Sequence, residues 1–158
     1  MIILGIDPGT YHCGYGVIEI DKKKIVAAAC GDINAENIGD LSGKLVFIYH
    51  NIKRIISEFK PTAAAVETIF YGKNVKSAFT LGHARGVIML ALAEAGLPVD
   101  EYSPREIKKA VVGNGNAAKE QVQFMVQRIL NLKNQTVTPD SADALAVAMC
   151  KFHKLILG

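Results

Sequence analysis

Apolar residues along this chain fall into two patterns, short continuous runs and longer stretches with helical spacing. The run IILGI at 2–6 is continuous and largely aliphatic, which is typical of a strand buried on both faces. Residues 11–20 and 25–33 predict two more strands, which the polar segment DKKK joins as a hairpin. The chain therefore opens with three predicted strands.

Strands then alternate with helices. Apolar side chains at helical spacing predict an amphipathic helix over 41–59, through Leu41, Leu45, Ile48, Ile52, Ile55 and Phe59. A short strand follows at 61–69, and then a long, largely buried helix over about 75–95, which Gly96-Leu97-Pro98 ends. Residues 99–103 predict a fifth strand.

The last third of the chain is predicted to be helical. Ser103, Pro104 and Glu106 have the spacing of a capping box with proline in the first turn, so a helix begins there. A Gly/Asn loop, GNGNAAKE, leads to a helix whose apolar face carries Val122, Met125, Val126 and Ile129. Thr138 and Pro139 begin the last helix.

This order of elements favours an α/β fold, with a mixed five-stranded sheet flanked by helices. The chain has 158 residues and shows no repeat, linker or low-complexity tract. We therefore expect one domain over residues 1–158, long enough to bury a sizeable core.

Composition narrows the class of protein. Apolar residues make up 50% of the chain and charged residues 21%, which is ordinary for a soluble globular protein. The three cysteines lack CxxC spacing, which disfavours a disulfide scaffold or a structural zinc site and suits a reducing cytoplasm. We expect no signal peptide, since the first strand starts at Met1, and no membrane span, since Glu94 interrupts the longest apolar run.

The positions of the basic residues indicate the kind of binding partner more clearly than the net charge of +3 does. Between Glu67 and Glu94 there is no acid, and the basic residues there are Lys73, Lys76 and Arg85. From 104 to 133 two acids accompany six basic residues, which are Arg105, Lys108, Lys109, Lys119, Arg128 and Lys133. This distribution suits a polyanionic partner, whereas a solvated helix face is the simpler interpretation of any single lysine.

Four acidic residues lie in apolar surroundings. Asp7 ends the first predicted strand, and Glu67 lies near the end of the fourth. Asp140 and Asp143 are three residues apart, on one side of the last helix. Simpler explanations exist for two of them, because DPG favours a tight turn at Asp7 and an acid in a first turn, such as Asp140, favours the helix dipole.

Taken together, the four acids predict a metal site. Parallel strands bring their carboxyl ends to one edge of a sheet, where α/β folds place their sites. Carboxylates gathered there repel one another, and hard divalent cations such as Mg²⁺ or Mn²⁺ relieve the repulsion. Two such ions about 3.5–4 Å apart form the arrangement used to cleave phosphodiesters. The acids therefore predict metal-dependent phosphodiester cleavage.

Five motifs follow one another along essentially the whole chain. They are GIDPGT at 5–10, ETIFYGKN at 67–74, LGHARGV at 81–87, VVGNGNAAKEQVQ at 111–123 and DSADALA at 140–146. In this order and spacing they resemble the RuvC family of bacterial Holliday-junction resolvases, which have a ribonuclease-H-like fold. The fragment DPGT alone is not specific, because actin-like ATPases use a similar phosphate loop.

The resemblance implies roles for individual residues. The four acids match the metal ligands of the family, which here are Asp7, Glu67, Asp140 and Asp143. Lys119 matches a lysine near the scissile phosphate, and Lys108 matches a basic residue at the DNA surface. Phe70 matches an aromatic residue that stacks on a base at the opened junction, although without the resemblance it would be read as core. Other lysines expected to contact DNA are Lys73, Lys76 and Lys109.

The activity implied by the resemblance is resolution of Holliday junctions by paired symmetric nicks, during recombination and DNA repair. The products would carry 5′-phosphate and 3′-hydroxyl ends, and the cofactor would be Mg²⁺, with Mn²⁺ as a substitute and two ions per site. A homodimer is implied as well, because a two-fold dimer presents identical sites to opposed strands of the junction. We assign its surface to the helix over 75–95. The branch-migration proteins RuvA and RuvB are the implied partners.

Three other interpretations are weaker. A four-way-junction-binding protein without nuclease activity would favour fewer acids facing phosphate. An actin-like ATP-binding protein needs two domains that close over the nucleotide, and 158 residues do not supply them. A ribonuclease-H-like nuclease with another substrate is disfavoured by the motifs at 67–74 and 111–123.

Overall fold

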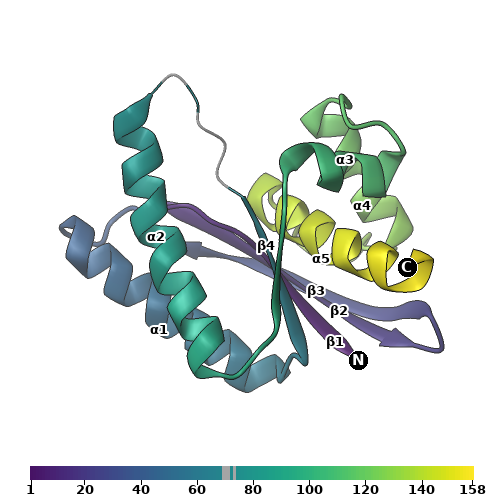
Figure 1. Ribbon diagram of the computed structural model, residues 1–158, viewed down its shortest axis with the longest axis horizontal. Coiled ribbons are helices and arrows are strands. Elements are labelled where there is room, and N and C mark those ends of the chain that lie inside the picture. Colours follow the sequence, from purple (N-terminus) through teal and green to yellow (C-terminus); the bar gives the residue numbers. More distant parts are fainter. Residues whose placement is uncertain (69–71, 73) are drawn as a thin grey trace.

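The sheet is mixed and five-stranded, as the sequence predicts. The computed structural model describes residues 1–68, 72 and 74–158 (Figure 1). Its strands lie in the order β3-β2-β1-β4-β5. β1 pairs antiparallel with β2 and parallel with β4. The strand pairing therefore changes from antiparallel to parallel at β1. The strand bounds are Ile2–Asp7 for β1, His12–Asp21 for β2, Lys24–Asn34 for β3, Ala63–Glu67 for β4 and Val99–Tyr102 for β5.

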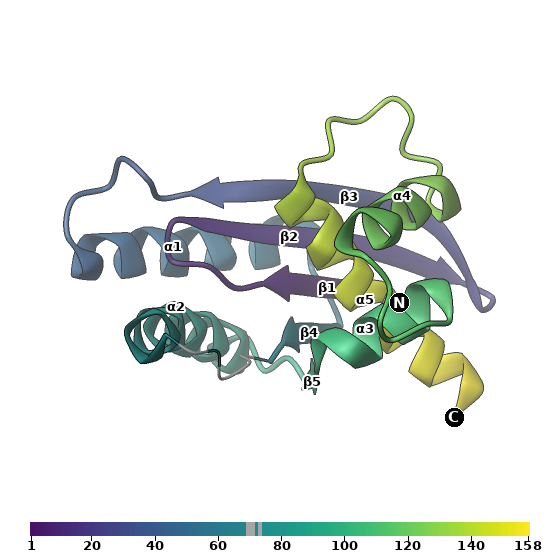
Figure 2. The ribbon, with the colours of Figure 1, turned by 90° about the horizontal axis from the view of Figure 1, so that it is seen from above.

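Helices cover both faces of the sheet (Figures 1 and 2). One apolar core lies between the sheet and the pair α1 (Leu41–Phe59) and α2 (Val75–Glu94). The second core lies on the other face, under α3 (Pro104–Val112), α4 (Lys119–Ile129) and α5 (Pro139–Leu157). Among the described residues, no helix is both long enough and apolar enough to cross a membrane.

Most predicted boundaries hold within two residues, and two of these small differences have a structural explanation. The fourth strand begins at Ala63 instead of 61, because Pro61 has no amide hydrogen to donate to a ladder. The predicted loop at 113–120 is shorter, because α4 already begins at Lys119. The DKKK hairpin is confirmed, and Lys22 and Lys23 have the positive φ angles of 46° and 65° that its tight turn requires.

Helix α5 lies directly on the central strands because glycines leave room for its backbone. A Cβ atom on Gly5 would lie 2.2 Å from the carbonyl oxygen of Ala144, and one on Gly14 would lie 2.1 Å from that of Asp140. Gly16 makes a similar approach to Leu145. Side chains at these positions would push α5 off the sheet, so the glycines set how deeply this helix sits.

Side-chain caps fix where α3 and α5 begin. Ser103 and Glu106 form the predicted capping box at α3, and Thr138 and Ser141 form another at α5. A proline occupies the first turn of each helix. The predicted starts of both helices are therefore confirmed.

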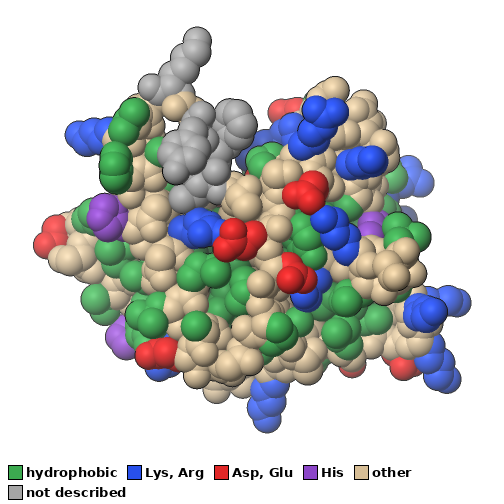
Figure 3. Space-filling model, viewed as in Figure 1, with side chains coloured by type: hydrophobic (Ala, Val, Ile, Leu, Met, Phe, Trp, Pro, Cys, Tyr) green, Lys and Arg blue, Asp and Glu red, His purple; other side chains and the backbone are tan. Residues whose placement is uncertain are grey.

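Ion pairs hold the outer edge of the sheet to its helices. Figure 3 shows basic and acidic side chains next to one another near the middle of the viewed face. Arg85 of α2 lies 2.8 Å from Glu101, and Lys154 of α5 lies 2.7 Å from Glu106. The buried ammonium of Lys151 pairs with Asp100. These pairs join β5, α2, α3 and α5 into one frame.

Candidate active site

Three of the four predicted acids form a compact group. Asp7 ends β1, while Asp140 and Asp143 lie in the first turns of α5, which the glycines bring down onto that strand. Each offers one carboxylate oxygen, and these three atoms all lie within 4.8 Å of one another. All three side chains are partly buried, so this group can hold a metal ion through oxygen ligands.

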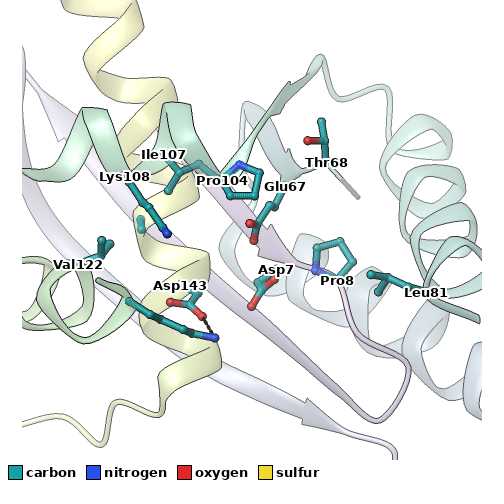
Figure 4. A pocket seen from close by; sticks show the side chains of 12 residues that line it. Asp7, Pro8, Glu67, Thr68, Leu81, Pro104, Ile107, Lys108, Val122 and Asp143 are labelled. Carbon is teal, nitrogen blue, oxygen red and sulfur yellow. Dashed lines mark ion pairs between the residues drawn. The ribbon is translucent and has the colours of Figure 1, made fainter. Parts of the chain in front are cut away.

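Glu67 is the fourth acid and lies beside Asp7. The two end parallel strands, and the register pairs Ile6 with Val66 immediately before them. Both carboxylates face a cavity of about 460 Å³ (Figure 4). Its lining consists of Asp7, Pro8, Glu67, Thr68, Leu81, Pro104, Ile107, Lys108, Lys119, Val122, Asp143 and Ala146. The predicted meeting of these two strand ends is therefore observed.

Crowding of negative charge shifts the titration of this pair. Burial raises the pKa of Asp7 to about 8, and its contact with the Glu67 carboxyl is the next cause. Burial also raises the pKa of Glu67, while Lys119 and Lys108 act in the opposite direction. The two neighbouring carboxyls therefore favour keeping a proton at the site when no cation is bound.

Helix α4 contributes a cation to the acids. The Lys119 ammonium lies 2.9 Å from Oδ2 of Asp143, and this contact raises the pKa of Lys119. The dashed line in Figure 4 marks this ion pair. Lys108 of α3 also lines the cavity. Two of the predicted basic residues therefore lie at the acidic group.

The other residues predicted to bind DNA lie away from the acids or outside the described residues. Lys76 is exposed in the first turn of α2, and Lys109 is exposed on α3, outside the cavity lining. Phe70 and Lys73 lie outside the described residues. The geometry brings Lys108 and Lys119 to the acids and leaves Lys76 and Lys109 at the surface.

Gln123 is a site residue that the sequence reasoning missed. Its Nε2 donates a hydrogen bond to Oδ1 of Asp143 at 3.3 Å, so Lys119 and Gln123 hold both oxygens of this carboxylate. A signal for it existed, because residues four apart share one helix face. Thr10 was also missed. Its hydroxyl donates to the carbonyl of Thr80 at 3.1 Å and ties the turn behind Asp7 to α2.

This arrangement defines a class of protein. Acids at the carboxyl ends of β1 and β4, joined by acids from a helix lying across a mixed sheet, are the design of ribonuclease-H-like, metal-dependent nucleases. Residues 3–151 match the family model for crossover junction endodeoxyribonuclease RuvC. The chain belongs to the RuvC family.

Relatives and solved structures agree with this assignment. The crossover junction endodeoxyribonuclease RuvC of Heliobacterium modesticaldum is 48% identical over 158 residues, which is 100% of this chain and 98% of that protein. The structure of Thermus thermophilus RuvC is 34% identical with a TM-score of 0.86, over 99% of this chain and 96% of that one. T. thermophilus RuvC in complex with a Holliday junction substrate gives 33% identity and a TM-score of 0.90, over 100% and 96%. The predicted fold and family are confirmed.

Proposed function

We propose that this chain is a metal-dependent endodeoxyribonuclease that resolves four-way DNA junctions by paired symmetric nicks, in recombination and DNA repair. The observation that carries the proposal is the group formed by Asp7, Asp140 and Asp143, whose oxygens lie within 4.8 Å of one another. This group lies in a chain that matches the family of crossover junction endodeoxyribonucleases over residues 3–151. The products would carry 5′-phosphate and 3′-hydroxyl ends.

The donor set fits a hard divalent cation. Asp7, Asp140 and Asp143 would hold it through carboxylate oxygens, with Glu67 as a fourth ligand from the neighbouring strand. We propose Mg²⁺, with Mn²⁺ as a substitute and two ions per site. When bound, the cation supplies positive charge and Lewis acidity for phosphodiester hydrolysis. Burial and the neighbouring Glu67 carboxyl raise the pKa of Asp7 to about 8, and a bound cation would offset both effects by favouring the charged carboxylate.

The two lysines of the cavity would bind the phosphate next to the acids. Lys119 is held by Asp143 at 2.9 Å, and Asp143 is in turn held by Gln123. Lys108 extends into the same cavity from α3 (Figure 4). Cations fixed in advance stabilise charge that develops on a phosphate without the cost of reorganising at the moment of reaction. We therefore assign Lys119 to the scissile phosphate and Lys108 to the DNA backbone.

Further contacts to DNA are proposed for one aromatic residue and three lysines. Phe70 would stack on a base of the opened junction, and Lys73 would bind the nearby backbone. Lys76 and Lys109 are exposed lysines on α2 and α3, the helices on the two sides of the cavity, and would contact phosphates outside the cut site. Such contacts add affinity without reading sequence.

We also propose a homodimer built on α2. Val75, Phe79 and Leu90 are 66%, 69% and 53% exposed. At about 100° per residue they share one stripe of the helix with Gly82 and Gly86. No described atom lies within 4 Å of a Cβ built on either glycine, so a second helix could approach the backbone closely there. An apolar stripe interrupted by small residues suits a two-fold helix pair, which would place two sites on one junction.

We propose RuvA and RuvB as partners because the chain belongs to the RuvC family. The cytoplasmic location also stays a prediction, and the free thiols of Cys13, Cys30 and Cys150 support it.

Junction cleavage tests the proposed function. The protein is incubated with a labelled mobile four-way junction, or with linear duplexes of the same sequences, in Mg²⁺ and in EDTA. We expect symmetric nicks in two opposed strands of the junction, in Mg²⁺ alone, and intact linear duplexes. Tight junction binding without nicks in Mg²⁺ or Mn²⁺ would contradict the proposal and favour a binding protein without nuclease activity.

A further inference from the structure

A second hollow, of about 480 Å³, lies at the carboxyl end of α4. Its lining consists of Phe124, Gln127, Arg128, Asn131 and Lys133. Among the described residues that line it, none is acidic. Two cations and two amides supply the donors that recognise a sugar–phosphate backbone.

Phe124 is the unusual residue of this surface. Its side chain is 57% exposed, although α4 already packs on the core through Val122 and Val126. The Arg128 guanidinium lies one turn further along, 5.6 Å from the centre of the Phe124 ring. The ring therefore favours this position of the guanidinium, and a cation that is partly positioned in advance loses less side-chain entropy when it binds a phosphate.

The position of α4 relates this surface to the acids. Lys119, the first residue of the helix, touches Asp143. Arg128 follows nine residues later, which is about 13 Å along the helix axis at 1.5 Å per residue. For a duplex arm that follows the axis of α4 away from Lys119, with a rise of 3.4 Å per base pair, this length corresponds to about four base pairs. Figure 2 shows α4 at the rim of the molecule, next to the loop that leads into α5.

The side chains of Phe124 and Arg128 point in a direction from which they cannot bind the phosphate that is cut. At about 100° per residue, Phe124 and Arg128 project roughly 140–180° around the helix from Lys119. They therefore face outward while Lys119 faces the acids. DNA that leaves the cut site over the rim of α4 would meet them, whereas the nucleotide held by the acids would not.

We propose that Phe124 and Arg128, with Lys133, form a second DNA contact that binds the backbone of a duplex arm about four base pairs from the cut. The inference rests on the proposed function, because the arm belongs to the junction held at the acids. The contact contributes affinity that depends on salt and not on sequence. It takes no part in the cleavage step.

The test compares Phe124→Ala/Arg128→Gln with Arg54→Gln, which removes one exposed arginine from the opposite face of the sheet. Gel-shift titrations of a four-way junction at several salt concentrations give the affinity. Single-turnover cleavage in Mg²⁺ gives the maximal rate. We expect the double variant to bind about fivefold to tenfold more weakly, with a salt slope smaller by about one, and to cut at the wild-type rate when saturated.

Neutral methylphosphonates then locate the contact. Placed three to five nucleotides from the cut, they should weaken binding by wild type clearly more than binding by the double variant, which keeps only Lys133 as a cation of this contact. The proposal would be overturned if the double variant had the same affinity and salt slope as Arg54→Gln. It would also be overturned if wild type and the double variant were equally sensitive to every methylphosphonate. Because gel shifts do not depend on cleavage, a wild type that binds but does not cut would contradict the proposed function alone.

Discussion

A Cβ atom on Gly14 would lie 2.1 Å from the carbonyl oxygen of Asp140, so strand β2 and the first turn of α5 meet backbone to backbone. This contact sets the depth at which α5 lies on the sheet. It therefore also sets how near Asp140 and Asp143 come to Asp7, whose oxygens lie within 4.8 Å of theirs. The packing of α5 and the geometry of the acidic group both depend on the absence of a side chain at Gly14.

Gly14→Ala should damage stability and cleavage together. The added methyl group meets backbone, which cannot give way as a flexible side chain would, so we expect a loss of about 3 kcal/mol in the free energy of unfolding. Junction cleavage should fall at least tenfold as the acids separate. Gly39→Ala is the matched control, since no atom of the described residues lies within 4 Å of its Cβ. Urea denaturation measures the free energy of unfolding of both variants. Equal values for Gly14→Ala and Gly39→Ala would contradict the close contact.

The metal-free protein should lose stability as the pH rises. The pKa of Asp7 is raised from 3.8 to about 8 in the fold, chiefly by burial, so the folded state binds the extra proton between these values. Stability then falls from about pH 4 to pH 8. Asp7→Asn removes the charge, and we expect a flatter profile and a more stable protein at pH 8 in EDTA.

Divalent metal provides the second half of this test. Mg²⁺ should stabilise the wild type at pH 8 by binding the folded state, and it should stabilise Asp7→Asn far less. Asp21→Asn serves as the control, because Asp21 is exposed at the β2–β3 hairpin. Parallel pH profiles for wild type and Asp7→Asn in thermal unfolding would contradict the raised pKa of Asp7.

Glu106 should stabilise the protein above about pH 4.5. Lys154 and the Ser103 cap lower its pKa from 4.5 to about 2, so its contribution is complete above the unfolded value and disappears as the pH falls to about 2. Glu106→Gln should cost about 1 kcal/mol at pH 7, a modest value because the side chain is 45% exposed. The difference from wild type should shrink between pH 4.5 and pH 2. A difference independent of pH would rule out the charged cap.

A charge on the exposed stripe of α2 should separate the homodimer. Phe79→Glu puts a carboxylate at the 69% exposed centre of the stripe, where the paired helix would have to desolvate it. Sedimentation equilibrium should give a dimer for wild type and a monomer for the variant. Val46→Glu, at a 55% exposed position of α1, should stay dimeric. A wild-type monomer would contradict the assignment of α2.

Local patterns predicted much of the fold because they depend on few residues. The apolar spacing predicted α1 at its observed bounds, and the acids in apolar surroundings predicted that Asp7, Asp140 and Asp143 come together. The contact between Gly14 and Asp140 joins distant segments and could not be read from either one. Lys44 was missed for a different reason, because a lysine within an amphipathic helix is ordinarily read as solvated. Its buried ammonium donates to carbonyls of Ala35, Glu36 and Ile38, and nothing near it in the sequence indicates this.

The single-turnover rate of junction cleavage in Asp7→Asn tests the central claim most directly. The substitution keeps the shape of the side chain and removes the charge that would hold the cation. With Mg²⁺ and saturating protein, the rate should fall at least a thousandfold while junction affinity stays within about threefold of wild type, and Asp21→Asn should behave as wild type. Cleavage by Asp7→Asn near the wild-type rate would contradict the account, because the metal would then have to be held elsewhere.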